Sequence, residues 1–138
     1  MDIERIHKAL TGGETTRVEF KSCRDKVSNS VYDTVCSFSN HSGGLIILGF
    51  DDDMNLIGVN KNASVNLKKN IINTLGNKEV FFPKLTIEPE IEEYDGKTII
   101  VIDVPVSQYP VRYKNKYFDR VGDADMDITD NMELVLGL

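Results

Sequence analysis

An acidic pair near the amino terminus and a later run of three aspartates contain side chains that could hold a metal ion. Glu14 and Glu19 are followed by Lys21, and Asp51 is the first residue of an Asp-Asp-Asp run. Carboxylates from separate segments bind Mg2+ or Mn2+, which prefer oxygen ligands, and a nearby lysine can steady a water molecule or a phosphate. Glu14, Glu19 and Asp51, with Lys21, are therefore a candidate catalytic site for phosphodiester hydrolysis.

The same acids also have a simpler interpretation as solvated side chains, since the chain holds 22 Asp and Glu residues. Side chains five residues apart in a strand point to opposite faces, so Glu14 meets Glu19 only if the chain bends at residues 14–16. The run at residues 51–53 is also typical of a turn, and it lacks the bidentate Glu that ends a calcium-binding loop. Both interpretations stay open at this stage, and whether the chain is an enzyme stays open with them.

Basic side chains form short groups that could contact phosphate. A net charge of −6 weighs against a domain that coats itself with nucleic acid, because that affinity comes from Lys and Arg that release counterions. Binding is therefore predicted to be weak and local, and scattered lysines on solvated faces are the alternative. Arg120 has its own second interpretation, as a brace for Asp119 or a nearby turn. The candidate contacts are Lys21, Arg24, Lys26, Lys61, Lys68, Lys69, Arg112, Lys114, Lys116 and Arg120.

The elements that would position these residues follow from apolar patterning. Residues 45–50 are continuously apolar, which predicts a central strand covered on both faces. Before it, Val27, Val31, Val35 and Phe38 recur at helical spacing, which predicts a helix over residues 27–41 that buries one face against this strand. Ser28 or Asn29 is its predicted cap.

Turn signals and periodicity predict the remaining elements. Asp95-Gly96 is a two-residue hairpin signal, and Asp130 with Glu133 resembles a capping box that opens a final helix. The other predictions are a helix from residue 3 to Gly12-Gly13, a strand at 17–21, a hairpin turn at 51–55 leading into a strand at 56–59, a helix at 65–75, strands at 85–92 and 98–104, and a hairpin over 112–118.

Length and composition predict a single domain. The chain has 138 residues and no apolar run approaching the roughly 20 that span a membrane, and its start lacks the features of a signal peptide. We therefore expect a cytoplasmic protein without membrane contact, in which Cys23 and Cys36 stay reduced and partly buried. The apolar residues 134–138 end without a cap, which suggests the amino-terminal part of a longer protein.

Several segments together resemble the Schlafen-type AlbA-like domain, whose usual pattern includes "E..t.EfK", "aFaNt.GG.iiiGv.DdG.i.Gv" and "y.RvG". The matching segments are Thr-Thr-Arg-Val-Glu-Phe-Lys at 15–21, Cys-Ser-Phe-Ser-Asn-His-Ser-Gly-Gly-Leu-Ile-Ile-Leu-Gly-Phe-Asp-Asp-Asp at 36–53, Ile-Gly-Val at 57–59 and Tyr-Phe-Asp-Arg-Val-Gly at 117–122. The resemblance covers nearly the whole chain. The chain departs from the common pattern at Ser37, Ser39, His41 and Asp123.

This resemblance implies an α+β fold with a mixed, largely antiparallel sheet flanked by helices. Bacterial and archaeal members precede a winged-helix part in transcriptional regulators, which implies a non-catalytic domain that binds nucleic acid, DNA above all. Animal relatives include enzymes that cleave RNA with three carboxylates around a divalent metal. By that resemblance Glu14, Glu19 and Asp51 would be the metal ligands, with Asp52 or Asp53 as alternatives to Asp51.

Three functions therefore remain open at this point. The first is the nucleic-acid-binding regulatory domain, and the second is a metal-dependent endonuclease that acts on RNA or single-stranded DNA with Mg2+ or Mn2+. The third is a dimerisation unit that uses the aromatic segment 109–118. A nucleotide-hydrolysing function has no support, because the chain contains no GxxxxGK[ST] loop.

Overall fold

A computed structural model describes residues 3–12 and 17–138. Its main sheet has the strand order β1-β2-β5-β4, and it comprises β1 (Val18–Lys21), β2 (Gly44–Leu48), β4 (Glu90–Tyr94) and β5 (Lys97–Val104). β1 pairs with β2 in parallel, and the other two pairings are antiparallel. The predicted α+β class with a mixed, largely antiparallel sheet is confirmed. β2 is the predicted central strand, and all five of its residues are buried.

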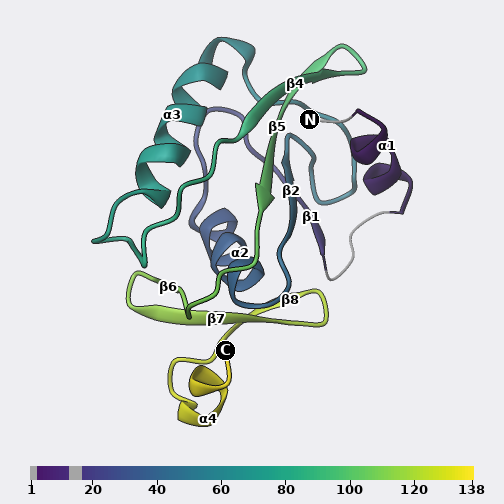
Figure 1. Ribbon diagram of the computed structural model, residues 1–138. Helices are drawn as coiled ribbons and strands as arrows, with labels where there is room; N and C mark the ends of the chain where they lie inside the picture. The colour runs from purple at the N-terminus through teal and green to yellow at the C-terminus, as the bar shows by residue number, and fades with distance from the viewer. Residues whose placement is uncertain (1–2, 13–16) are drawn as a thin grey trace.

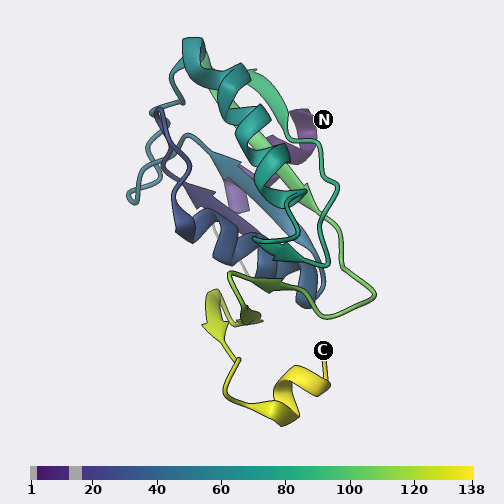
Figure 2. The same ribbon diagram turned by 90° about the vertical axis from the view of Figure 1, so that its left-hand side faces the viewer.

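Helices cover both faces of this sheet (Figures 1 and 2). α2 (Asn29–Asn40) and α3 (Ser64–Leu75) lie on one face, and α1 (Ile3–Gly12) lies on the other. Ile46 and Leu48 join the larger core with Val31, Val35 and Phe38 of α2, as the periodicity predicted. The alternate β2 residues, among them Ile47, form a smaller core with Phe20 and Phe50.

A second sheet lies below α2 in Figure 1 and was not predicted as a separate layer. Its order is β3-β6-β7-β8, with β3 (Phe81–Phe82), β6 (Arg112–Tyr113), β7 (Lys116–Val121) and β8 (Ala124–Asp127). Because this sheet packs against the side of α2 that faces away from β2, Thr34 and Ser37 are fully buried. The prediction that this helix buries one face only is therefore wrong.

Two hairpins are built as their turn residues predict. Asp95 and Gly96 both have positive φ, 48° and 76°, between β4 and β5, and Lys114 and Asn115, at 50° and 65°, connect β6 to β7. Positive φ at both central positions is the geometry of the two-residue turn whose twist matches that of paired strands. Gly43, with φ 74°, makes the sharp turn from α2 into β2.

Element boundaries differ from prediction in several places. α4 (Met132–Leu136) is capped by Asn131, whose side chain accepts a hydrogen bond from the Leu134 N–H, so the predicted cap at Asp130 is wrong. Residues 56–59 contribute one bridge, Phe50 to Leu56, rather than a strand, and the strand expected at 85–92 begins at Glu90. A short 3-10 helix, η1 (Lys61–Ala63), precedes α3. Cys23 and Cys36 are free and buried.

Within the part of the chain that the structure describes, no helix is both long and apolar enough to cross a bilayer.

Candidate functional site

Arg120 on β7 is the most deeply buried charged side chain in the site region. Its residue is only 3% exposed. One guanidinium nitrogen donates to Glu19 Oε2 at 2.8 Å, and another donates to Asp125 Oδ1 at 2.7 Å. The guanidinium carbon also lies 4.8 Å from the centre of the Phe38 ring. Glu19 belongs to β1 and Asp125 to β8, so Arg120 connects the two sheets across α2.

Two hydroxyl groups of α2 provide further hydrogen bonds to the carboxylate of Asp125. Thr34 and Ser37 of α2 both donate to the carboxylate of Asp125. Burial lowers the pKa of Arg120, but the hydrogen bonds and charges of Glu19 and Asp125 outweigh this effect and raise that pKa above its ordinary value. Arg120 therefore stays charged. Ser37, one of the departures from the usual pattern, has a role as a donor in this cluster.

The predicted metal ligands are only partly brought together. Glu14 lies outside the described residues. Glu19 is paired with Arg120, and its other oxygen lies 3.5 Å from Lys21 Nζ. Asp51 accepts hydrogen bonds from the N–H groups of Asp53 and Asn55 at 3.0 and 2.8 Å and from the Asn55 side-chain amide at 3.0 Å, which lower its pKa. Asp51 thus organises its own turn, as the alternative interpretation of this run predicted.

A polar pocket of about 360 Å3 lies at the end of β1 and the start of α2. Glu19 and Lys21 line it together with Asp52, so Asp52 rather than Asp51 shares a pocket with Glu19. Three serines supply hydroxyl groups to its wall: Ser22, Ser28 and Ser30. Among the described residues, no three His, Cys, Asp or Glu side chains form a group that could hold a metal ion.

Three lysines from different elements converge near the start of α2. Lys21 of β1, Lys114 of the β6–β7 turn and Lys116 of β7 all act electrostatically on Asp33 of α2. Lys114 Nζ also donates to Asn29 Oδ1 at 3.2 Å. We call Lys21, Lys114 and Lys116 the lysine cluster. It unites two of the basic groups that the sequence predicted separately.

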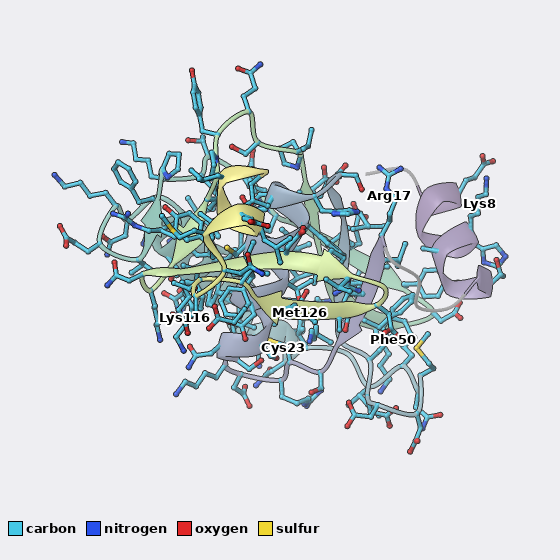
Figure 3. All side chains as sticks on the ribbon, turned by 90° about the horizontal axis from the view of Figure 1, so that it is seen from below. Lys8, Arg17, Cys23, Phe50, Lys116 and Met126 are labelled. Carbon is cyan, nitrogen blue, oxygen red and sulfur yellow. The ribbon has the colours of Figure 1, made fainter. Side chains whose placement is uncertain are left out.

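Lys114 and Lys116 of the lysine cluster are exposed, whereas the side chain of Lys21 is 20% exposed and pairs with Glu19. Lys116 Nζ lies 4.0 Å from Asp127 Oδ2, and its side chain is 60% exposed. In Figure 3, Lys116 lies at the end of β7 remote from α1. Burial raises the pKa of Asp33, Asp125 adds to that rise, and the lysine cluster opposes it without cancelling it. The partly buried carboxylate of Asp33 therefore offsets part of the charge of the lysine cluster.

Three other basic side chains predicted to contact phosphate, Arg24, Lys26 and Arg112, differ in their interaction partners. Arg24 donates to the carbonyl of Gly58 at 3.1 Å, and exposed Lys26 lines a second pocket of about 320 Å3 at the start of α2. The guanidinium of Arg112 lies 4.9 Å from the centre of the Phe82 ring. Arg120 requires a correction as a phosphate contact: its guanidinium is buried and committed to two carboxylates. No sequence signal separated Arg120 from exposed Lys116 on the same strand.

Comparison with known proteins gives one family and a shared fold. Residues 14–129 match the family model described as Schlafen, AlbA_2. A structure of the DIP2311 protein from Corynebacterium diphtheriae is 16% identical with a TM-score of 0.64, and the match covers 91% of this chain and 29% of that one. The N-terminal domain of a RecG-related protein from Nitrosomonas europaea, whose name refers to an ATP-dependent DNA helicase, is 23% identical with a TM-score of 0.64 and coverages of 89% and 90%. No curated protein matches the sequence.

Proposed function

Because the chain belongs to the Schlafen AlbA_2 family, we propose that it binds nucleic acid, DNA above all, as a non-catalytic domain of a transcriptional regulator. The observation that carries this proposal is the lysine cluster. Its three cations come from elements distant in sequence and lie around the start of α2: Lys21 lines the pocket there, Lys114 reaches Asn29, and Lys116 acts on Asp33. The chain that holds them has a net charge of −6. A local concentration of cations on an acidic domain supports binding of phosphates at that place alone.

The start of α2 adds to the attraction for phosphate. Its N-cap residue Ser28 makes no side-chain cap hydrogen bond, and its hydroxyl instead pairs with that of Ser30. The first N–H groups of a helix carry partial positive charge and attract anions. Lys26 extends the basic surface beside the same helix end. Phosphate contacts of this kind position a nucleic acid without reading its sequence.

Sequence recognition would then come from another part of the protein. We propose that a carboxy-terminal winged-helix part follows this domain in the complete regulator and supplies the base contacts. The name of the Nitrosomonas europaea neighbour, which refers to a DNA helicase, fits a domain of this fold that works beside DNA. The chain spans only 29% of the length of the DIP2311 structure, which accords with such a domain being combined with further segments.

The test is the salt dependence of binding in matched double variants. Lys114→Ala with Lys116→Ala removes two cations of the lysine cluster, and Lys69→Ala with Lys78→Ala removes two exposed lysines at or just beyond α3. Fluorescence anisotropy with a labelled oligonucleotide should show that the first pair weakens binding and lowers the slope of log K against log salt by about 2, whereas the second pair changes neither. An equal loss in both pairs would place the interface elsewhere.

A metal-dependent endonuclease is the second candidate, favoured by the pocket that Glu19, Lys21 and Asp52 share. The described residues do not fit a divalent cation as they stand, because Arg120 already neutralises Glu19 and Asp51 is used by its turn. Our leading proposal predicts that millimolar Mn2+ leaves the melting temperature unchanged. A rise that is lost in Glu19→Gln, kept in the exposed control Asp95→Asn, and accompanied by cleavage of RNA or single-stranded DNA would establish the nuclease.

A further inference from the structure

One face of the second sheet packs against the hydrophobic core, and the other face is exposed to solvent. Phe81, Tyr113 and Phe118 are buried, at 0%, 3% and 9% exposure, on the side that packs toward α2. Residues directly opposite each other on paired strands share a face. Phe82 pairs with Arg112, and Arg112 pairs with Tyr117, so these three side chains form a row across three strands on the opposite face.

This row has an unusual composition for a solvent-facing surface. Phe82 is 52% exposed, and the guanidinium of Arg112 lies 4.9 Å from the centre of its ring. Tyr117 is partly buried at the far end of the row. Figure 3 views the second sheet from below and labels Met126 of β8, which is exposed and pairs with Asp119. An aromatic ring, a guanidinium and a phenol are therefore arranged side by side on an accessible sheet face.

We propose that unpaired bases of a single-stranded nucleic acid stack on the Phe82–Arg112–Tyr117 row, an inference that rests on the proposed function. Every base has a π face, so aromatic rings and guanidinium planes bind single strands with little regard to sequence. Duplex bases are already stacked on each other and offer only their edges to a protein. The row thus selects single strands over duplexes.

The position of the row relative to Lys114 supports this occupant. Arg112 lies two residues before Lys114, which is roughly 7 Å along the chain, and Lys114 opens the β6–β7 turn. Lys116 pairs with Tyr113 and so lies on the opposite face of the sheet. A single-stranded nucleic acid whose bases lie on the row can therefore run its phosphates toward Lys114. Arg112 within the row and Lys114 beside it match the negative charge of a nucleic acid.

The absence of tryptophan from the sequence allows a direct optical test. Phe82→Trp places a single indole in the row, and stacking of a base on it should quench its emission. Tyr109→Trp is the matched control, because Tyr109 is 69% exposed in the loop between β5 and β6 and has no cation–π contact among the described residues. The probes are an oligothymidylate, an abasic strand of the same length, and a duplex.

We expect oligothymidylate to quench Phe82→Trp and neither the abasic strand nor the duplex to do so, while Tyr109→Trp stays bright. In anisotropy, Phe82→Ala and Phe82→Leu should weaken binding of oligothymidylate by roughly five- to a hundredfold and leave the abasic strand unaffected. Melting curves check that the variants remain folded.

The outcomes separate this inference from the proposed function. Equal binding of base-bearing and abasic strands, without quenching, overturns stacking alone and leaves phosphate binding at the lysine cluster intact. Failure of every probe to bind at low salt overturns both. Emission of Phe82→Trp that depends on protein concentration but not on oligonucleotide would assign this face to a second copy of the chain, and would overturn the inference.

Discussion

Arg120 and Lys116 are cations on the same strand, β7, yet their surroundings are opposite. Arg120 is 3% exposed and held by Glu19 and Asp125 at 2.8 and 2.7 Å. The side chain of Lys116 is 60% exposed, and Asp127 lies 4.0 Å away. A buried cation with two close partners fixes the spacing of the two sheets, whereas an exposed cation with one distant partner can exchange it for a phosphate. The charge of Arg120 thus stabilises the fold, whereas the charge of Lys116 is available for binding.

The largest expected effect is the loss of the buried cation. Arg120→Ala leaves the carboxylates of Glu19 and Asp125, largely shielded from water, without their counter-charge, and breaking a buried pair in this way costs about 3–5 kcal/mol. Urea unfolding should show that loss, while Lys116→Ala changes the free energy of unfolding by less than about 0.5 kcal/mol. Similar losses in the two variants would remove the distinction between the two cations.

Truncation of an apolar side chain at the centre of the main sheet gives a reference value for the free energy of unfolding, with which the effect of Arg120→Ala can be compared. Ile47 is fully buried between β1 and β5 in the smaller core. Ile47→Ala should lower the free energy of unfolding by about 2–5 kcal/mol, because it removes buried methyl and methylene groups and leaves a cavity. If this loss is below about 1 kcal/mol, the sheet centre contributes less than we infer and the Arg120 cluster dominates.

The smallest expected effect on stability concerns Asp33, which is influenced both by Asp125, the partner of Arg120, and by the lysine cluster. Its pKa is raised above the ordinary 3.8 by burial and by Asp125. A raised pKa means that the ionised form destabilises the folded state, so stability falls as the pH rises through the window above 3.8. Asp33→Asn should therefore raise the melting temperature slightly at pH 7, and this gain should vanish below pH 3.8, where both proteins are neutral at this position.

The same substitution should affect binding. Removing the negative charge beside the lysine cluster should strengthen nucleic-acid binding about two- to fivefold at pH 7, the scale of one partly screened charge. Anisotropy measured with the Asp33→Asn variant checks this value. Unchanged binding would mean that nucleic acid does not approach the start of α2.

Much of the fold could be predicted because its signals are local. The apolar run at residues 45–50 and the stripe of Val31, Val35 and Phe38 required no knowledge of distant residues. Asp95-Gly96 predicted a hairpin from its own backbone preferences. β8 was not predicted because Ala-Asp-Met-Asp has no β-branched residues. Its formation depends on pairing with β7 and on the contact between Asp125 and Arg120, which the local sequence does not reveal.

The candidate site was less predictable, because burial decides what a charge does. The sequence indicated that Lys21, Lys114, Lys116 and Arg120 were basic, but it could not indicate that Arg120 turns inward. The sequence also could not indicate that Phe82 is exposed, since one aromatic of the Phe-Phe pair is buried in the core and the other lies on the surface. Such assignments need the tertiary arrangement of strands that are far apart in sequence.

The most direct test of the central claim, that the lysine cluster and the adjoining sheet face bind nucleic acid, is an NMR titration. Addition of a short oligothymidylate to the 15N-labelled domain at low salt should move the amide signals of residues 26–30 and 112–117 and of Phe82. The signals of residues 65–73 on α3 should stay in place, and the moved signals should return as salt is added. Shifts confined to α1 and the β4–β5 turn, or none at low salt, would contradict the account.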